Sequence, residues 1–179
     1  MKKLLFAAIA ALGFTFANAQ PVQDQSHLLA SLCLENVIYM VPQVDMMGAK
    51  FQNAFDYSAP FGKELEDLWG NDVSPFWVSS NRNFNVTIKA GSPYFFYFGT
   101  GTGNNLMPAG VLDYKVASNF TGGLSNGLWH QLGVLDQTII SGGEYGFMKP
   151  FSIKLRATPG WNYTGGVYTM DVVLTATQQ

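Results

Sequence analysis

The sequence predicts an all-β protein, a single β-sandwich of roughly eight to ten strands. Apolar and polar residues alternate with a period of two along much of the chain. Turns rich in glycine, proline and asparagine separate these stretches at short intervals. Only 12% of the residues are charged and 15% are aromatic, which is typical of a packed β-protein and not of a disordered chain.

Residues 1–19 have the three parts of a cleavable export signal. Two lysines at 2–3 precede an apolar stretch at 4–16, and the small-x-small pattern Ala-Asn-Ala at 17–19 follows. The apolar stretch is about thirteen residues long, whereas a membrane-spanning helix needs about twenty. We therefore expect cleavage before Gln20 and export to the periplasm, the cell surface or the medium.

The mature chain, 20–179, has 160 residues and is expected to form one domain. Removal of two signal lysines changes the formal net charge from −2 to −4. This mild acidity argues against nucleic-acid binding, which needs a basic face. Cys33 is the one cysteine, so no internal disulfide is available, and its context does not fit a lipid-anchor site.

The mature N-terminal region contains two predicted strands and one helical exception. A short apolar strand at 37–41 stops at Pro42, and the spacing of apolar residues predicts a helical turn over 62–70. The other predicted strand, at 28–34, places its alternate residues Leu28, Ala30, Leu32 and Leu34 on one face. This strand is a candidate for pairing either with a neighbouring subunit or within its own sheet.

The middle of the chain predicts a hairpin. Phe76 and Val78 precede a polar turn at 79–82, and a second alternating stretch follows. The inward residues of that stretch are expected to be Phe84, Val86 and Ile88. Five consecutive aromatic residues at 94–98 indicate either a central strand covered on both sides or a segment awaiting a partner.

The C-terminal third predicts further strands. Apolar residues alternate at 112–116 and 151–155, and a short apolar strand lies at 137–140. A long turn at 158–166 leads to a final strand at 168–176, which we expect to be continuous and to pair beside 151–155. The order of these elements indicates a sandwich without a second domain.

No group of residues forms a recognisable catalytic or cofactor site. The letters Gly-Leu-Ser-Asn-Gly at 123–127 match a hydrolase nucleophile motif around Ser125, but the required strand before it and helix after it are not predicted. His27 and His130 do not have zinc-ligand spacing with Cys33. We therefore expect a protein that is not an enzyme and that needs no metal or cofactor.

Two other groups leave alternatives open. Glu64, Glu66, Asp67 and Asp72 form either a solvated acidic face or a calcium site. Trp161 and Tyr163, in the long turn, are the candidates for contact with a glycan. The competing interpretation is that the aromatic residues of this chain serve core and turn packing.

The motif Gly166-Val167-Tyr168-Thr169 and the segment 77–90 resemble the closing hairpin and the mid-domain segment of pilin-like secreted proteins of Gram-negative bacteria. The resemblance covers about the last two-thirds of the mature chain. The acidic loop and the aromatic run at 94–98 depart from that pattern. The resemblance implies an immunoglobulin-like sandwich at the cell surface, in some members part of fimbriae.

We therefore expect a non-catalytic, secreted or cell-surface structural or adhesive protein, such as a filament subunit. Its expected partners are copies of itself, or other surface-filament subunits, joined by strand addition. The alternative function is that of a soluble glycan-binding module.

Overall fold

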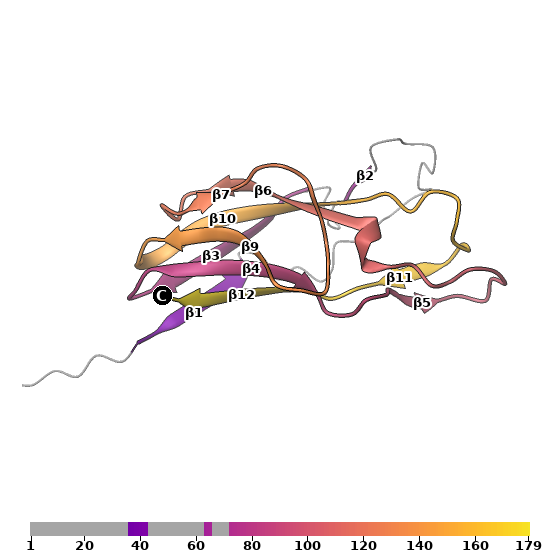
Figure 1. Ribbon diagram of the computed structural model, residues 1–179, viewed down its shortest axis with the longest axis horizontal. Coiled ribbons are helices and arrows are strands. Elements are labelled where there is room, and N and C mark those ends of the chain that lie inside the picture. The colour runs from indigo at the N-terminus through magenta and orange to yellow at the C-terminus, as the bar shows by residue number, and fades with distance from the viewer. Residues whose placement is uncertain (1–35, 43–62, 66–71) are drawn as a thin grey trace, which may run out of the picture. The chain divides into compact units, whose positions relative to one another are not determined.

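The computed structural model describes residues 36–42, 63–65 and 72–179. They belong to one compact unit that spans 35–179, and residues 1–34 lie outside the described residues. The described part consists of antiparallel strands and a single 3-10 turn at Ala109–Val111 (Figure 1). In these ranges no helix is both long and apolar enough to span a bilayer.

The described residues contain twelve strands, more than the sequence predicts, because three of them are only two residues long. In chain order they are β1 Ile38–Pro42, β2 Lys63–Glu64, β3 Ser74–Ser80, β4 Phe84–Ala90, β5 Phe96–Phe98, β6 Leu112–Asn119, β7 Leu124–Ser125, β8 His130–Gln131, β9 Gln137–Gly143, β10 Gly146–Ala157, β11 Val167–Thr169 and β12 Val172–Gln178.

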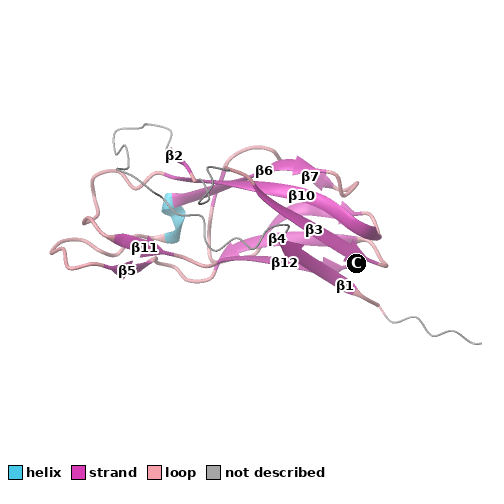
Figure 2. Ribbon diagram, turned by 180° about the vertical axis from the view of Figure 1, so that it is seen from behind, coloured by secondary structure: helices cyan, strands magenta, loops and turns pink. Residues whose placement is uncertain are grey.

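The strands form three antiparallel sheets. Sheet 1 has six strands in the order β1-β3-β10-β6-β8, with β2 paired to β10. Sheet 2 has four strands in the order β12-β4-β9-β7. The third sheet is a two-stranded unit of β5 and β11, which we call the aromatic ribbon and which extends from one end of the sandwich (Figures 1 and 2).

The core lies between sheets 1 and 2, and both sheets contribute the inward half of their alternating residues. Sheet 2 contributes Phe84, Val86 and Ile88 of β4, all fully buried. Each main strand therefore places one apolar face in the core, which confirms a packed, sandwich-like all-β fold. The buried residues of sheet 1 include Val78, Leu112, Tyr114, Val116, Phe151 and Ile153.

The predicted hairpin between β3 and β4 is wrong. The alternation in both strands is confirmed, but β3 pairs with β1 and β10, whereas β4 pairs with β12 and β9. The turn at 81–83 carries the chain from one sheet to the other, and the Ser80 hydroxyl donates to the carbonyl of Arg82 at 2.6 Å. An alternating pattern specifies the buried face of a strand, but two strands of opposite sheets share the same core.

The final strand is also different from the prediction. It is broken at Met170 and Asp171, so that β11 belongs to the aromatic ribbon and β12 to sheet 2. Consequently β12 runs beside β4 and not beside residues 151–155 of β10. The break is held where the backbone N–H of Gly91 donates to the carbonyl of Asp171 at 2.8 Å.

The prediction of a helical turn over 62–70 is wrong for 63–65, the residues of that segment that the structure describes. Lys63 and Glu64 are extended and pair with β10, because the backbone hydrogen bonds available at that sheet edge favour a strand. The next residue, Leu65, is buried in the core. The strand predicted at 37–41 is confirmed by β1, while the candidate assembly strand at 28–34 lies outside the described residues.

Candidate functional site

The aromatic ribbon has one face that packs and one that does not. Its register pairs Phe98 with Val167, Tyr97 with Tyr168 and Phe96 with Thr169. Successive side chains of a strand point to opposite faces. The two tyrosines therefore share the inner face, where their rings are 5.1 Å apart, and the phenylalanines share the outer face.

The inner face is held by hydrogen bonds to the flanking loops. The Tyr97 hydroxyl donates to the carbonyl of Gly165 and accepts from the N–H of Gly101, both at 3.1 Å. The Tyr97 ring lies so close to Gly166 that a Cβ there would be 2.3 Å from the ring. Glycine is thus required at this position for the tyrosine to dock, and the docked ring fixes the orientation of the ribbon.

The outer face exposes large apolar side chains to solvent. Phe96 and Phe98 are 60% and 63% exposed, and the neighbouring Val167 is 60% exposed. The first alternative for the aromatic run, a strand covered on both sides, is therefore wrong. A two-stranded sheet with an uncovered apolar face is expected to gain stability from a partner.

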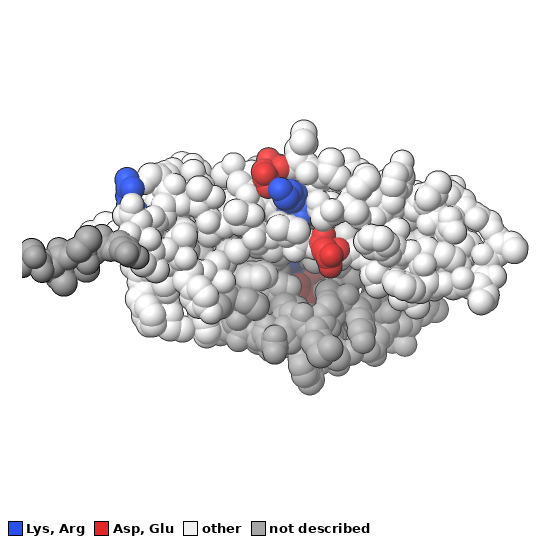
Figure 3. Space-filling model, turned by 90° about the horizontal axis from the view of Figure 1, so that it is seen from below, with Lys and Arg blue, Asp and Glu red and all other residues white. Residues whose placement is uncertain are grey.

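The described segments at this end of the sandwich carry no charge. Residues 90–112 and 157–170 contain no lysine, arginine, aspartate, glutamate or histidine. The space-filling view in Figure 3 shows the ribbon end, at the right, without a charged side chain, and a few charged groups nearer the middle of that face. Binding at this end therefore depends on apolar contact and neutral hydrogen bonds.

The predicted glycan-contact residues lie at the same end. Trp161 is 77% exposed in the turn before β11, and Tyr163 is half-buried in that turn. The turn is tied to the opposite loop, since the Asn104 side chain donates to the carbonyl of Asn162 at 3.2 Å and the Asn104 carbonyl accepts from Thr164 at 2.8 Å. The structure thus brings Trp161 to the uncharged end that the ribbon forms.

The other end of the sandwich exposes a second apolar group, which we call the distal cluster. A β-bulge between Gly146 and Lys149, with Met148 at a φ of 50°, interrupts the alternation of β10 and directs both Phe147 and Met148 outward. The same end carries the turn after β6 and the turn between β9 and β10, joined where Glu144 N–H donates to Thr121 at 2.8 Å. The exposed apolar side chains of the distal cluster are Phe120, Leu124, Tyr145, Phe147 and Met148.

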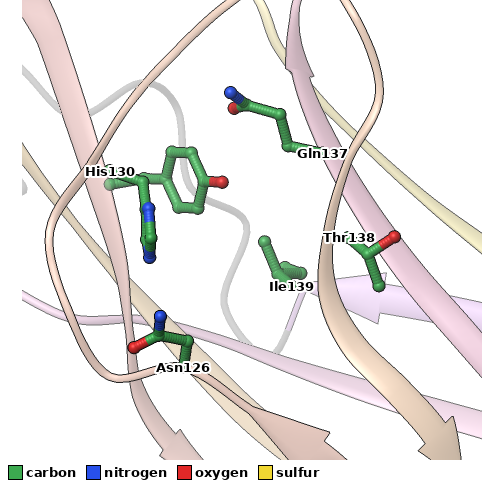
Figure 4. Close-up of a pocket in the computed structure, with 6 residues that line it drawn as sticks. Asn126, His130, Gln137, Thr138 and Ile139 are labelled. Carbon is green, nitrogen blue, oxygen red and sulfur yellow. The ribbon is translucent and has the colours of Figure 1, made fainter.

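A pocket of about 250 Å³ opens between sheets 1 and 2. Strands β6 and β8 contribute Tyr114 and His130, whose rings are 5.8 Å apart. Figure 4 shows the side chains of His130, Gln137 and Asn126 around this space, while the hydroxyl of Thr138 points away from it. Ile139, the sixth lining residue, is buried, so the pocket combines an apolar residue with polar side chains.

The two described residues of the acidic cluster, Glu64 and Asp72, form ion pairs with lysine side chains of the same chain. The ammonium group of Lys154 contacts Glu64 Oε2 at 3.0 Å and also Asp72 Oδ2, and Lys115 lies 3.8 Å from Glu64 Oε1. The hydrogen bond from Lys154 lowers the pKa of Asp72, and the same contact raises the pKa of Lys154. These ion pairs favour the solvated-face interpretation over a calcium site, although Glu66 and Asp67 lie outside the described residues.

Ser125 does not have the surroundings of a nucleophile elbow. It ends the two-residue strand β7, and in the described chain it is followed by a loop and the short strand β8, where the motif requires a helix. Its hydroxyl accepts a hydrogen bond from the Asn119 side chain at 3.1 Å. The serine is therefore part of a turn that Asn119 organises.

Comparison with protein-family models and with curated proteins gives no match. The sandwich-like all-β fold therefore rests on the structure alone. Sequence reasoning missed the distal cluster and the pocket. A signal for the cluster is present in the apolar residues Tyr145, Phe147 and Met148 around Gly146, but the pocket joins segments that only folding brings together.

Proposed function

We propose that the mature chain is a non-catalytic, secreted or cell-surface structural protein that assembles end to end into a filament. In this proposal it is an immunoglobulin-like, pilin-like sandwich exported by its signal peptide. The observation that carries the proposal is the uncharged aromatic ribbon, whose outer face leaves Phe96, Phe98 and Val167 exposed together. Contiguous apolar surface of this kind marks contact sites between proteins.

The distal cluster supplies the second half of the argument. The two apolar groups lie at opposite ends of the described unit (Figure 1). A contact between two different surfaces of the same protein is heterologous, and such contacts propagate into open chains when the rotation between copies does not close a ring. The ribbon of one copy against the distal cluster of the next would therefore build a filament.

The sheet edges offer an additional mode of contact. Within the described residues β1 pairs only with β3, and β12 pairs only with β4. The two edge strands are linked by the Gln178 amide, which donates to the carbonyl of Val37 at 2.8 Å. An alternating strand such as 28–34 of a neighbouring copy would satisfy the open hydrogen-bonding groups of such an edge.

Trp161 favours the second candidate function, a glycan-binding module. Its exposed ring belongs to the turn in which the Asn162 backbone carbonyl accepts from the Asn104 side chain. Flat aromatic rings next to neutral hydrogen-bonding groups suit the apolar and hydroxyl faces of a sugar. In this alternative the same end would contact carbohydrate and the protein would remain a monomer.

The test is the size of the purified mature protein, measured by light scattering and by electron microscopy of negatively stained samples. The double variant Phe96→Ser/Phe98→Ser should lose the assembled species and remain folded, because both side chains point away from the core. The matched control is Leu135→Ser in the turn between β8 and β9, where the side chain is 78% exposed and belongs to neither end cluster.

Assembly of the wild type and of Leu135→Ser, together with a monomeric double variant, would support the proposal. A wild type that is monomeric at every concentration would contradict it. In that case, binding to a glycan array that is lost in Trp161→Ala would establish the second candidate.

A further inference from the structure

Met148 is the most exposed methionine of the described residues. Its side chain is 39% exposed, whereas Met107 is 7% exposed and Met40 and Met170 pack against the core. A thioether that solvent reaches is oxidised more readily than one inside a core. The described part of the chain therefore offers one readily accessible methionine sulfur to an oxidant.

The backbone holds the Met148 side chain at the surface. Met148 has a φ of 50° and is the one non-glycine residue of the described ranges with a positive φ. A residue with a side chain persists in this conformation only where the surrounding structure holds it there. The Met148 N–H donates to the Ser79 hydroxyl at 2.9 Å, which ties the bulge of β10 to the neighbouring strand β3. The sulfur is thus presented outward by a bulge that β3 holds in place.

The chemistry of the distal cluster suits a thioether and does not suit a sulfoxide. Tyr145 and Phe147, in the same turn, are 67% and 81% exposed, so the sulfur belongs to an apolar, aromatic surface. A thioether packs favourably against aromatic rings. A sulfoxide adds a strongly polar oxygen, and Phe96 and Phe98 on the outer face of the ribbon have no side-chain donor for it. Burial of such a group without a hydrogen bond costs free energy, so oxidation should weaken the contact.

We propose that Met148 is a site of reversible oxidation by peroxide and that its sulfoxide prevents end-to-end assembly. This inference rests on the proposed function, because it assigns a means of regulation to the distal cluster. In the reaction the sulfur attacks one oxygen of hydrogen peroxide, so that an S–O bond forms and the O–O bond breaks. The sulfur loses two electrons, and after proton transfer the second peroxide oxygen leaves as water. Methionine sulfoxide reductases remove the added oxygen again.

Assembly and oxidation should oppose each other. In a ribbon-to-distal contact the partner copy covers the Met148 sulfur, so free copies should be oxidised faster than assembled ones. Once oxidised, a copy should bind the ribbon of its neighbour about 5- to 150-fold more weakly, the factor that corresponds to one polar group buried without a partner. Peroxide should therefore act on the pool of free subunits and stop further growth.

The experiment treats the mature protein with a limiting amount of hydrogen peroxide. Peptide mass spectrometry then measures the sulfoxide at each methionine, and analytical ultracentrifugation measures assembly. We expect sulfoxide at Met148 well before Met107, and loss of the assembled species in step with it. Treatment with methionine sulfoxide reductase should restore assembly.

Three variants separate this sulfur from the rest of the chain, and thermal melting shows whether each is folded. Met148→Leu keeps an apolar side chain of similar size and should assemble with or without peroxide. Met148→Gln places a polar, uncharged side chain there and should assemble poorly without any oxidant. The matched control is Met170→Leu, which changes a methionine outside the distal cluster and should remain as sensitive to peroxide as the wild type.

The outcomes distinguish this inference from the proposed function. Peroxide that dissociates the wild type and leaves Met148→Leu assembled would support it. Equal loss of assembly in these two proteins would overturn the inference alone, as would assembled wild type that carries the sulfoxide at Met148. A wild type that is monomeric before treatment would overturn the proposed function, and this inference with it.

Discussion

Replacement of Phe84 by alanine tests the packing of the sandwich. Phe84 begins β4 and is fully buried, and its ring packs on Gly143 so closely that a Cβ at Gly143 would be 2.7 Å from it. Because glycine has no side chain that could move into the vacated space, the cavity should stay open. Truncation of a buried phenylalanine to alanine costs about 3–5 kcal/mol. In a domain of this size each kcal/mol lowers Tm by about 2–4 °C, so Tm should fall by about 6–20 °C.

The assay is thermal and urea unfolding of the mature protein, followed by circular dichroism. The control is Thr87→Ala on the same strand, where the side chain faces outward. This substitution should lower the free energy of unfolding by less than about 1 kcal/mol. Asn85 is unsuitable as a control, because its side-chain oxygen accepts from Gly142 N–H and from the Gln179 amide, both at 2.8 Å. Equal destabilisation by Phe84→Ala and Thr87→Ala would refute the assignment of the buried face.

Three further predictions concern the ion pairs, the last strand and export. The hydrogen bond from Lys154 lowers the pKa of Asp72 below its usual 3.8. The ion pair therefore stabilises the folded state above pH 3.8, and this stabilisation is lost as the pH falls through the lowered pKa. Asp72→Asn should therefore be less stable than the wild type at pH 7 and equal to it under strong acid, as measured by urea unfolding. Deletion of 172–179 should abolish soluble expression, because β4 loses a partner strand. Mass spectrometry of the exported protein should show Gln20 at its N-terminus, and an intact Met1 would contradict the signal-peptide prediction.

The sequence was sufficient to predict the buried faces of the main strands. The alternation at Phe84, Val86 and Ile88, and that at Leu112 and Tyr114, is confirmed by their burial. This part is predictable because the side chains of a strand alternate with a fixed period, so a local pattern determines which face is apolar. The class of fold follows directly from many such stretches.

Strand partners could not be predicted in the same way. The turn at 81–83 is compatible with a hairpin and with a crossing between sheets, and only the contacts of β3 with β10 and of β4 with β12 distinguish them. These contacts join residues far apart in the chain, and local periodicity contains no information about them. The break at Met170 and Asp171 was missed for the same reason, since apolar alternation continues through it.

The candidate sites also divide into features that a local sequence pattern indicates and features that only the fold creates. The exposure of Trp161 agrees with its position in a long turn, which the sequence indicates. The outward face of the ribbon was ambiguous, because a run of five aromatic residues has no polar members to mark the solvent side. The pocket could not be predicted, since Tyr114, His130 and Gln137 come from three strands of two sheets.

The most direct test of end-to-end assembly is a mixing experiment with one variant impaired at each end. Phe96→Ser/Phe98→Ser removes the ribbon contact, and Tyr145→Ser/Phe147→Ser removes the distal contact. A ribbon-to-distal contact predicts that each variant alone is monomeric and that their equimolar mixture forms dimers, but nothing longer, in analytical ultracentrifugation. Dimers of the distal variant alone would instead indicate a ribbon-to-ribbon contact, and a mixture that stays monomeric while the wild type assembles would contradict the account.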